Sequence, residues 1–173
     1  MITLIENIHE LLRQGLPQGT FKEYYIGIPV TKVENLLPCV ATEIVSMTSR
    51  LGPTGMDIDV YTMNMYVFFP KKQGVKEQHA KGELGNYRRM LDLLNKLDFT
   101  GTYATREDGP KSIMQILRSH LFLAGNSLNT STTEKVINND IDILLGPTNN
   151  EESFYYAKLT FKVSQYIQIA NRI

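Results

Sequence analysis

The first apolar pattern of the chain has a helical period. It predicts an amphipathic helix over residues 3–13, with an apolar stripe made of Leu4, Ile5, Ile8, Leu11 and Leu12. Thr3, with Glu6 three residues later, is the expected N-cap, and Gly15 is expected to end the helix. His9 is expected to be a surface residue of this helix.

Strand patterns fill the next part of the chain. Residues 21–28 are aromatic and β-branched, residues 40–48 alternate, and residues 56–69 form the longest strand pattern. Because residues 51–55 contain two glycines and a proline, we expect the last two segments to form a long antiparallel hairpin. Strict alternation places Val40, Thr42, Ile44, Ser46 and Thr48 on one face, and Ala41, Glu43, Val45 and Met47 on the other.

The second half of the chain continues with helix and strand patterns. Residues 86–97 and 111–123 have helical stripes, and residues 135–145 read as a strand interrupted at 138–140. Residues 154–169 alternate cleanly and predict a half-buried antiparallel strand. The order helix, three strands, two helices, two strands predicts a single α+β domain over residues 1–173. We expect a mostly antiparallel sheet with helices packed on one face.

Composition narrows the function classes. Eighteen acidic and eighteen basic residues balance, so the chain as a whole has no electrostatic attraction to nucleic acid or membrane. The single cysteine, Cys39, excludes an internal disulfide, and we expect it to be a small buried residue. No apolar run has the length of a membrane span, and the charged N-terminal pattern is unlike a signal peptide.

A basic, glycine-dotted tract follows the longest strand pattern. Residues 71–89 hold six basic and two acidic residues, a local charge of plus four that leaves minus four elsewhere. The basic residues are Lys71, Lys72, Lys76, Lys81, Arg88 and Arg89. Few of its residues are apolar, so we expect a long loop at about residues 70–86. It is either a solvated flexible loop or an arm that orders on a neighbouring subunit, an acidic surface or DNA.

Two Asp-Ile-Asp triplets are the candidates for metal chemistry. Asp57 with Asp59, and Asp140 with Asp142, would each share a strand face and could present two carboxylates to a divalent cation. With Lys158 they would suit a metal-dependent nuclease. The alternative is that they are solvent-facing carboxylates that discourage edge pairing. No catalytic motif occurs, so we expect no cofactor and no enzymatic activity.

Two tyrosine pairs, Tyr24 with Tyr25 and Tyr155 with Tyr156, stand at expected strand starts. Alternation turns one ring of each pair out of the core, and an exposed tyrosine is a common interface anchor. The four residues are therefore candidates for either the core or an interface.

Five segments carry a family resemblance. They are the N-terminal helix, the strands LPCVATEIVSM and MDIDVYTMNMYVFF, the helix NYRRMLDLLNKL and the closing strand YYAKLTFKVSQYIQI, with Pro38 opening the first strand. This layout resembles the tail-terminator (tail-completion) proteins of long-tailed bacteriophages. The match is one of pattern over most of the chain, and the basic tract and residues 111–133 depart from it.

The resemblance implies a structural virion protein of the tail or neck, assembled in the host cytoplasm. It implies a homo-oligomeric ring of six copies that caps the tail tube. Such a ring needs heterologous subunit contacts. Its expected partners are the tail tube protein, the head-completion or connector proteins and, transiently, DNA in the channel, with no membrane contact. Another neck or connector protein, the metal-dependent nuclease, and a binding module with a basic arm remain alternatives.

Overall fold

The computed structural model describes residues 2–29, 36–52, 56–71, 80–95, 112–119, 133–146 and 154–168. Its elements are α1 (Ile2–Gly15), β1 (Glu23–Ile26), β2 (Cys39–Leu51), β3 (Met56–Pro70), α2 (Ala80–Leu94), α3 (Ile113–Ser119), β4 (Thr133–Leu145) and β5 (Phe154–Gln168). The predicted order of helices and strands is confirmed. None of the described helices is long and apolar enough to cross a bilayer.

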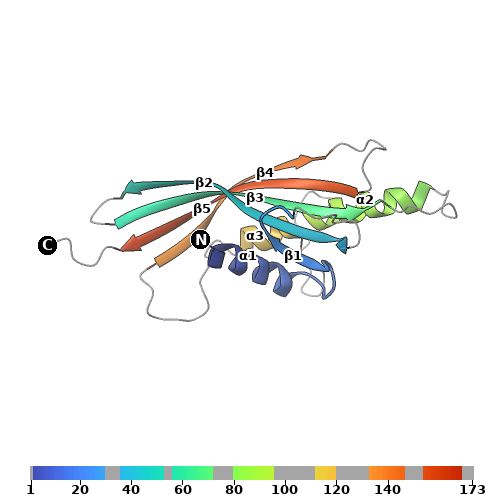
Figure 1. Cartoon of the computed structure of the whole chain (residues 1–173), viewed down its shortest axis with the longest axis horizontal. Coiled ribbons are helices and arrows are strands. Elements are labelled where there is room, and N and C mark those ends of the chain that lie inside the picture. The colour runs from blue at the N-terminus through green and yellow to red at the C-terminus, as the bar shows by residue number, and fades with distance from the viewer. Residues whose placement is uncertain are drawn as a thin grey trace.

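The five strands form one mixed sheet in the order β1-β2-β3-β5-β4. β1 runs parallel to β2, and the other three pairings are antiparallel. The predicted α+β class is therefore confirmed. The sheet is strongly twisted, and its left-hand end in Figure 1, where β2 and β5 finish, extends past α1 and α3.

The main core contains residues of all three helices and alternate residues of the sheet. β3 contributes every second residue from Tyr61 to Phe69, and β5 every second residue from Tyr155 to Val163. The helices contribute, among others, Ile8, Leu12, Met90, Leu94, Ile113 and Leu117. We call this side of the sheet the inner face and the other side the outer face. The predicted alternation of β5 is confirmed, because its apolar residues at odd positions lie in this core.

α2 begins at Ala80, inside the stretch that was expected to be a loop at about residues 70–86. Met90 and Leu94 are buried in the core, and the side-chain amide of Asn86 donates to the Pro70 carbonyl at 3.0 Å. These contacts anchor the helix. Extending an anchored helix by further residues is easier than nucleating one, so the helix continues through glycine positions that favoured a loop. Residues 72–79 of the expected loop lie outside the described residues.

The strict alternation predicted for β2 is wrong beyond Ile44, because the strand contains a β-bulge. The register with β3 shifts between Ile44 and Ser46, which leaves Val45 without a partner residue. Ile44 and Met47 therefore share the inner face, and Ser46 lies on the outer face. A second register shift, between Ile137 and Ile141 of β4, falls at the predicted interruption.

Two predictions for α1 are wrong. The helix begins at Ile2, so Thr3 lies within its first turn and is not the N-cap. His9 is 3% exposed rather than a surface residue, because its ring turns toward β2 and meets the hydroxyl of Thr42. A neutral imidazole with a polar partner is compatible with burial.

α3 confirms a helix at Ile113–Ser119, inside the range predicted over residues 111–123. It starts after a capping box: Gln115 N donates to Ser112 Oγ at 3.2 Å, and Ser112 N donates to Gln115 Oε1 at 3.3 Å. This signal, a serine followed three residues later by glutamine, was present in the sequence and places the helix start after Pro110. Residues 120–132 lie outside the described residues.

Candidate interaction surfaces

The sheet divides each tyrosine pair between its two faces. Tyr24 and Tyr155 pack with the main core, and Tyr25 and Tyr156 pack with a separate cluster on the outer face. Tyr155 is buried against Tyr87, with 5.3 Å between the ring centroids. Tyr25 and Tyr156 are therefore the tyrosines of the two pairs that point away from the main core, as alternation requires.

An aromatic patch covers one end of the outer face. We define this outer aromatic patch as Tyr25, Tyr66, Phe68, Phe154 and Tyr156, which come from β1, β3 and β5. Phe68 is its centre: its ring centroid lies 5.5 Å from that of Phe154, 6.2 Å from Tyr66 and 6.3 Å from Tyr156. Phe68 is buried, whereas the four surrounding rings keep part of their surface exposed. Three of these four rings are tyrosines, and tyrosine, apolar in body and polar at the tip, is typical of interaction surfaces.

A row of polar side chains borders the patch. Glu43, Asn64 and Thr160 are cross-strand neighbours on β2, β3 and β5. Thr160 Oγ1 donates to Asn64 Oδ1 at 2.9 Å, and Tyr66 OH donates to Glu43 Oε1 at 3.1 Å. Burial, followed by the hydrogen bond to Glu43, raises the pKa of Tyr66, so its hydroxyl stays protonated. The row therefore holds the Tyr66 ring in place at the border of the patch.

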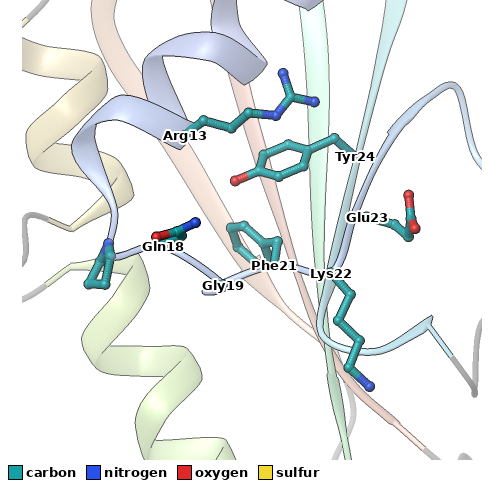
Figure 2. Close-up of a pocket in the computed structure, with 8 residues that line it drawn as sticks. Arg13, Gln18, Gly19, Phe21, Lys22, Glu23 and Tyr24 are labelled. Atoms are coloured by element: carbon teal, nitrogen blue, oxygen red, sulfur yellow. The ribbon is translucent and has the colours of Figure 1, made fainter.

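Two shallow pockets flank Tyr24 between α1 and β1. The first has a volume of about 380 Å³ and is lined by Arg13, Pro17, Gln18, Gly19, Phe21, Lys22, Glu23 and Tyr24. The second, of about 430 Å³, is lined by Glu6, Asn7, His9, Glu10, Arg13, Tyr24 and Ile26. The Arg13 guanidinium carbon lies 4.2 Å from the Tyr24 ring centroid, a cation–π contact between two residues that line both pockets; Figure 2 shows the first pocket.

Burial keeps two side chains uncharged at neutral pH: His9, which lines the second pocket, and Cys39, which lies in the cluster on the outer face. Burial, and then the charge of Arg13, lowers the pKa of His9 to about 4. Burial, and then the charge of Glu23, raises the pKa of Cys39 to about 12. At neutral pH the imidazole is neutral and the thiol is protonated, and a protonated thiol is not a nucleophile. Cys39 is the small buried residue that was predicted.

The structure does not bring the two aspartate pairs together. Asp57 and Asp59 lie in β3 on the inner side, near the end of the sheet where β2 finishes. Asp142 lies on the outer face of β4, and Asp140 lies at the register shift in that strand. Within the described ranges, no three Asp, Glu, His or Cys side chains are grouped so as to hold a metal ion.

The basic residues of the expected arm lie in different settings. Lys72 and Lys76 are outside the described residues, and Lys81 lies in α2. Arg88 and Arg89 are exposed on α2. Lys71 lies at the end of β3 with its Nζ atom 5.1 Å from the Tyr155 ring centroid. The Nζ atom of Lys158, the lysine of the nuclease hypothesis, lies 6.0 Å from the Tyr66 ring centroid.

No protein-family model matches the chain, and no curated protein matches it. The functional argument therefore rests on the surfaces described above. Sequence reasoning missed Tyr66, Phe68 and Phe154 as patch residues, although the signal was present. Aromatic residues occupy even positions of β3 and of β5, on the face opposite the core, at the end of the pairing where Pro70 meets Phe154.

Proposed function

We propose that this chain is a structural protein of a tailed-phage particle, which forms a ring that terminates the tail tube and joins tail to head. The observation that carries the proposal is the outer aromatic patch. Its partly exposed rings come from three strands of one sheet, which is the arrangement expected of a protein-binding surface. The separated aspartate pairs favour this role over the metal-dependent nuclease.

We also propose that the strands and helices follow the tail-terminator layout. β2 and β3 are paired from Cys39 with Phe68 to Leu51 with Asp57, and we assign them to the long hairpin of the tail-terminator layout. The helices then pack on the inner face, which leaves the outer face and the sheet edges for contacts between proteins. Support for this arrangement comes from the shared core cluster of the three helices and the inner-face residues.

The proposed partners follow from the surfaces. The outer aromatic patch would bind the tail tube protein or a head-completion protein through apolar and hydroxyl contacts. Arg88 and Arg89, exposed on α2, suit an acidic protein surface or the phosphates of passing DNA. A connector or other neck protein would use the same kinds of surface, so the identity of the bound partner separates these two roles.

Deleting the gene from its parent genome tests the role in the particle. A terminator function predicts unjoined heads and tails of uncontrolled length by electron microscopy. Restoring the wild-type gene should restore joined particles, whereas a Tyr156→Ala gene should restore them poorly because the patch loses an exposed ring. Normal particles from the deletion strain would refute the proposal.

The solution mass over a wide concentration range, with negative-stain images of the same samples, tests ring formation. A closed ring, six-fold under the proposed role, is the expected result for the wild-type chain and for Tyr156→Ala. A chain that stays monomeric at every concentration would count against a ring former.

A further inference from the structure

Both edges of the sheet end in strands with no second partner among the described residues. β4 pairs with β5 on one side, and β1 pairs with β2 on the other. Proteins usually protect such edges with charged residues or proline, because an open edge pairs readily with other strands. Both edge strands carry exposed charges, Glu23 on β1 and Asp140 and Asp142 on β4, but each strand also exposes apolar residues. The exposed apolar residues are Ile143 (36% exposed), Leu144 (64%) and Leu145 (40%) on β4, and Ile26 (49%) on β1.

The hydrogen bonds of β4 show which backbone groups face outward. Gly146 N donates to Tyr156 O at 2.9 Å, next to the pairing of β4 with β5. Along an antiparallel strand the bonding direction alternates from residue to residue, so Leu144 also faces β5. The amides and carbonyls of Ile143 and Leu145 therefore point to the open edge, and their side chains lie on the inner face.

The backbone groups of β1 also alternate between β2 and the open edge. Gly27 N donates to Thr42 O at 2.8 Å, in register with the parallel pairing of β1 and β2. By alternation, Tyr25 also faces β2. The backbone groups of Tyr24 and Ile26 therefore point to the open edge, and these side chains also lie on the inner face.

The directions of the strands make the two edges complementary. From the pairings, β1, β2 and β5 run one way, and β3 and β4 run the other way. A rotation about an axis along the strands preserves these directions from copy to copy. β4 of one copy would then meet β1 of the next copy in antiparallel orientation, which is the head-to-tail contact that a ring requires.

We infer that the copies of this chain associate by pairing β4 of one copy with β1 of the next, in a register that places Ile143 opposite Ile26 and Leu145 opposite Tyr24. The inference rests on the proposed ring and names the contact that builds it. In each of these pairs the two residues point their backbone groups at each other and their apolar side chains to the inner face. Between them, Leu144 lies opposite Tyr25 on the outer face.

Charge and shape agree with this register. The carboxylate of Asp142 falls on the outer face opposite Gly27, so the pairing sets no two like charges opposite each other there. The inner-face side chains Ile143 and Leu145 enter the side of β1 that holds α1. There the open pocket of about 430 Å³ lies between α1 and the exposed Ile26, and Ile26 and the Tyr24 ring form the apolar part of an otherwise polar lining.

Mixing two edge variants tests the head-to-tail contact. Ile26→Lys disables the β1 edge and Ile143→Lys disables the β4 edge, and each should weaken association about a hundredfold, leaving a monomer in sedimentation. An equimolar mixture should form a dimer, because each variant retains the edge that the other one lacks. Val45→Lys, a change at a residue of β2 that is 55% exposed and takes part in none of the proposed residue pairs, should assemble as wild type.

Disulfide trapping tests the register. Opposite residues of a hydrogen-bonded antiparallel pair have Cα atoms about 5.5 Å apart, within the range that a disulfide spans. The double variant Ile26→Cys/Ile143→Cys should therefore give an oxidised ladder of covalent oligomers. Ile143→Cys alone should form no covalent oligomers under oxidation, since covalent dimers would instead indicate a two-fold contact between two β4 strands. The buried Cys39 does not compete for oxidation.

The outcomes separate this inference from the proposed function. If the wild-type chain forms rings but the double cysteine variant gives no ladder, the β4–β1 contact is refuted and the ring proposal stands. The same holds if the edge variants do not complement each other. A ladder with open chains in place of rings would support the contact and refute the terminator role. A wild-type monomer without a ladder would refute both.

Discussion

The Nε2 atom of His9 lies 3.0 Å from the Oγ1 atom of Thr42, a residue thirty-three positions later in the sequence. Both side chains are buried, and their hydrogen bond joins α1 to β2 within the sheet's inner side. The His9 ring also lies against Tyr24, with 5.4 Å between the ring centroids. This one histidine therefore connects the N-terminal helix to the two strands at one edge of the sheet.

Acid should destabilise the fold through His9. Its pKa falls from 6.5 to about 4 on folding, so the unfolded chain binds a proton at a pH where the folded chain does not. The contribution of the neutral His9 to the free energy of unfolding is fully present above pH 6.5 and is lost as the pH falls from 6.5 toward about 4. Urea unfolding should show a loss on the order of 1–2 kcal/mol across that window, after allowance for solvent screening.

A His9→Gln variant is the control for this pH dependence. Glutamine retains a polar group for Thr42 but does not titrate, so the pH profile of unfolding should be flatter than in the wild type. Profiles that stay parallel over the window would show that another group causes the acid sensitivity.

Removing the side chain of Ile8 should damage the core. Ile8 is fully buried in the stripe of α1, so Ile8→Ala loses apolar burial and leaves a cavity that costs about 2–5 kcal/mol of unfolding free energy. Ile2→Ala, on the same helix at 62% exposure, should change it by less than about 0.5 kcal/mol. Equal effects in urea unfolding would contradict the position of α1.

Alanine at Gly146 should disturb the outer aromatic patch. A β-carbon there would lie 2.6 Å from Cδ1 and Cζ of Tyr156, and a ring cannot yield as a flexible chain end does. We expect Gly146→Ala to destabilise the protein by about 1–3 kcal/mol in urea unfolding. In a Tyr156→Ala background the same change should have little effect, because the clash is gone. If Gly146→Ala lowers the free energy of unfolding equally in the Tyr156→Ala background, the β-carbon does not clash with the Tyr156 ring.

Cys39 should report on unfolding. Its thiol is buried and protonated at neutral pH, since burial and Glu23 raise its pKa to about 12. Native protein should therefore resist a thiol-specific reagent, and protein in urea should be labelled completely. A Leu51→Cys variant, at a site that is 67% exposed, should be labelled at once under native conditions. Rapid labelling of Cys39 in the native protein would contradict its burial.

Much of the local structure could be predicted because it depends on the order of nearby residues. The stripe of α1 and the alternation of β5 from Tyr155 to Val163 follow from a helical period and a strand period. Both lie in the core as predicted, with Leu11 of the stripe only partly buried. Cys39 was predicted to be buried from its type and its place before a strand. These predictions succeeded because a single face of each element is apolar.

Contacts between distant residues explain the predictions that failed. His9 was placed at the surface because nothing near it in the sequence indicates Thr42 as a partner. The start of α2 at Ala80 depends on anchors such as the bond from Asn86 to Pro70. The bulge at Val45 follows from the pairing of β2 with β3, which local alternation does not report.

The sequence by itself determined the type and order of the helices and strands and the apolar faces of α1 and β5, because these follow from side-chain type and period. The tertiary structure alone decided that β1 lies parallel to β2, that β5 lies between β3 and β4, and that the aromatic rings at Phe68 and Tyr156 meet on the outer face. Strand order and surface patches depend on which distant segments pair, and that choice is made by the packing of the whole chain.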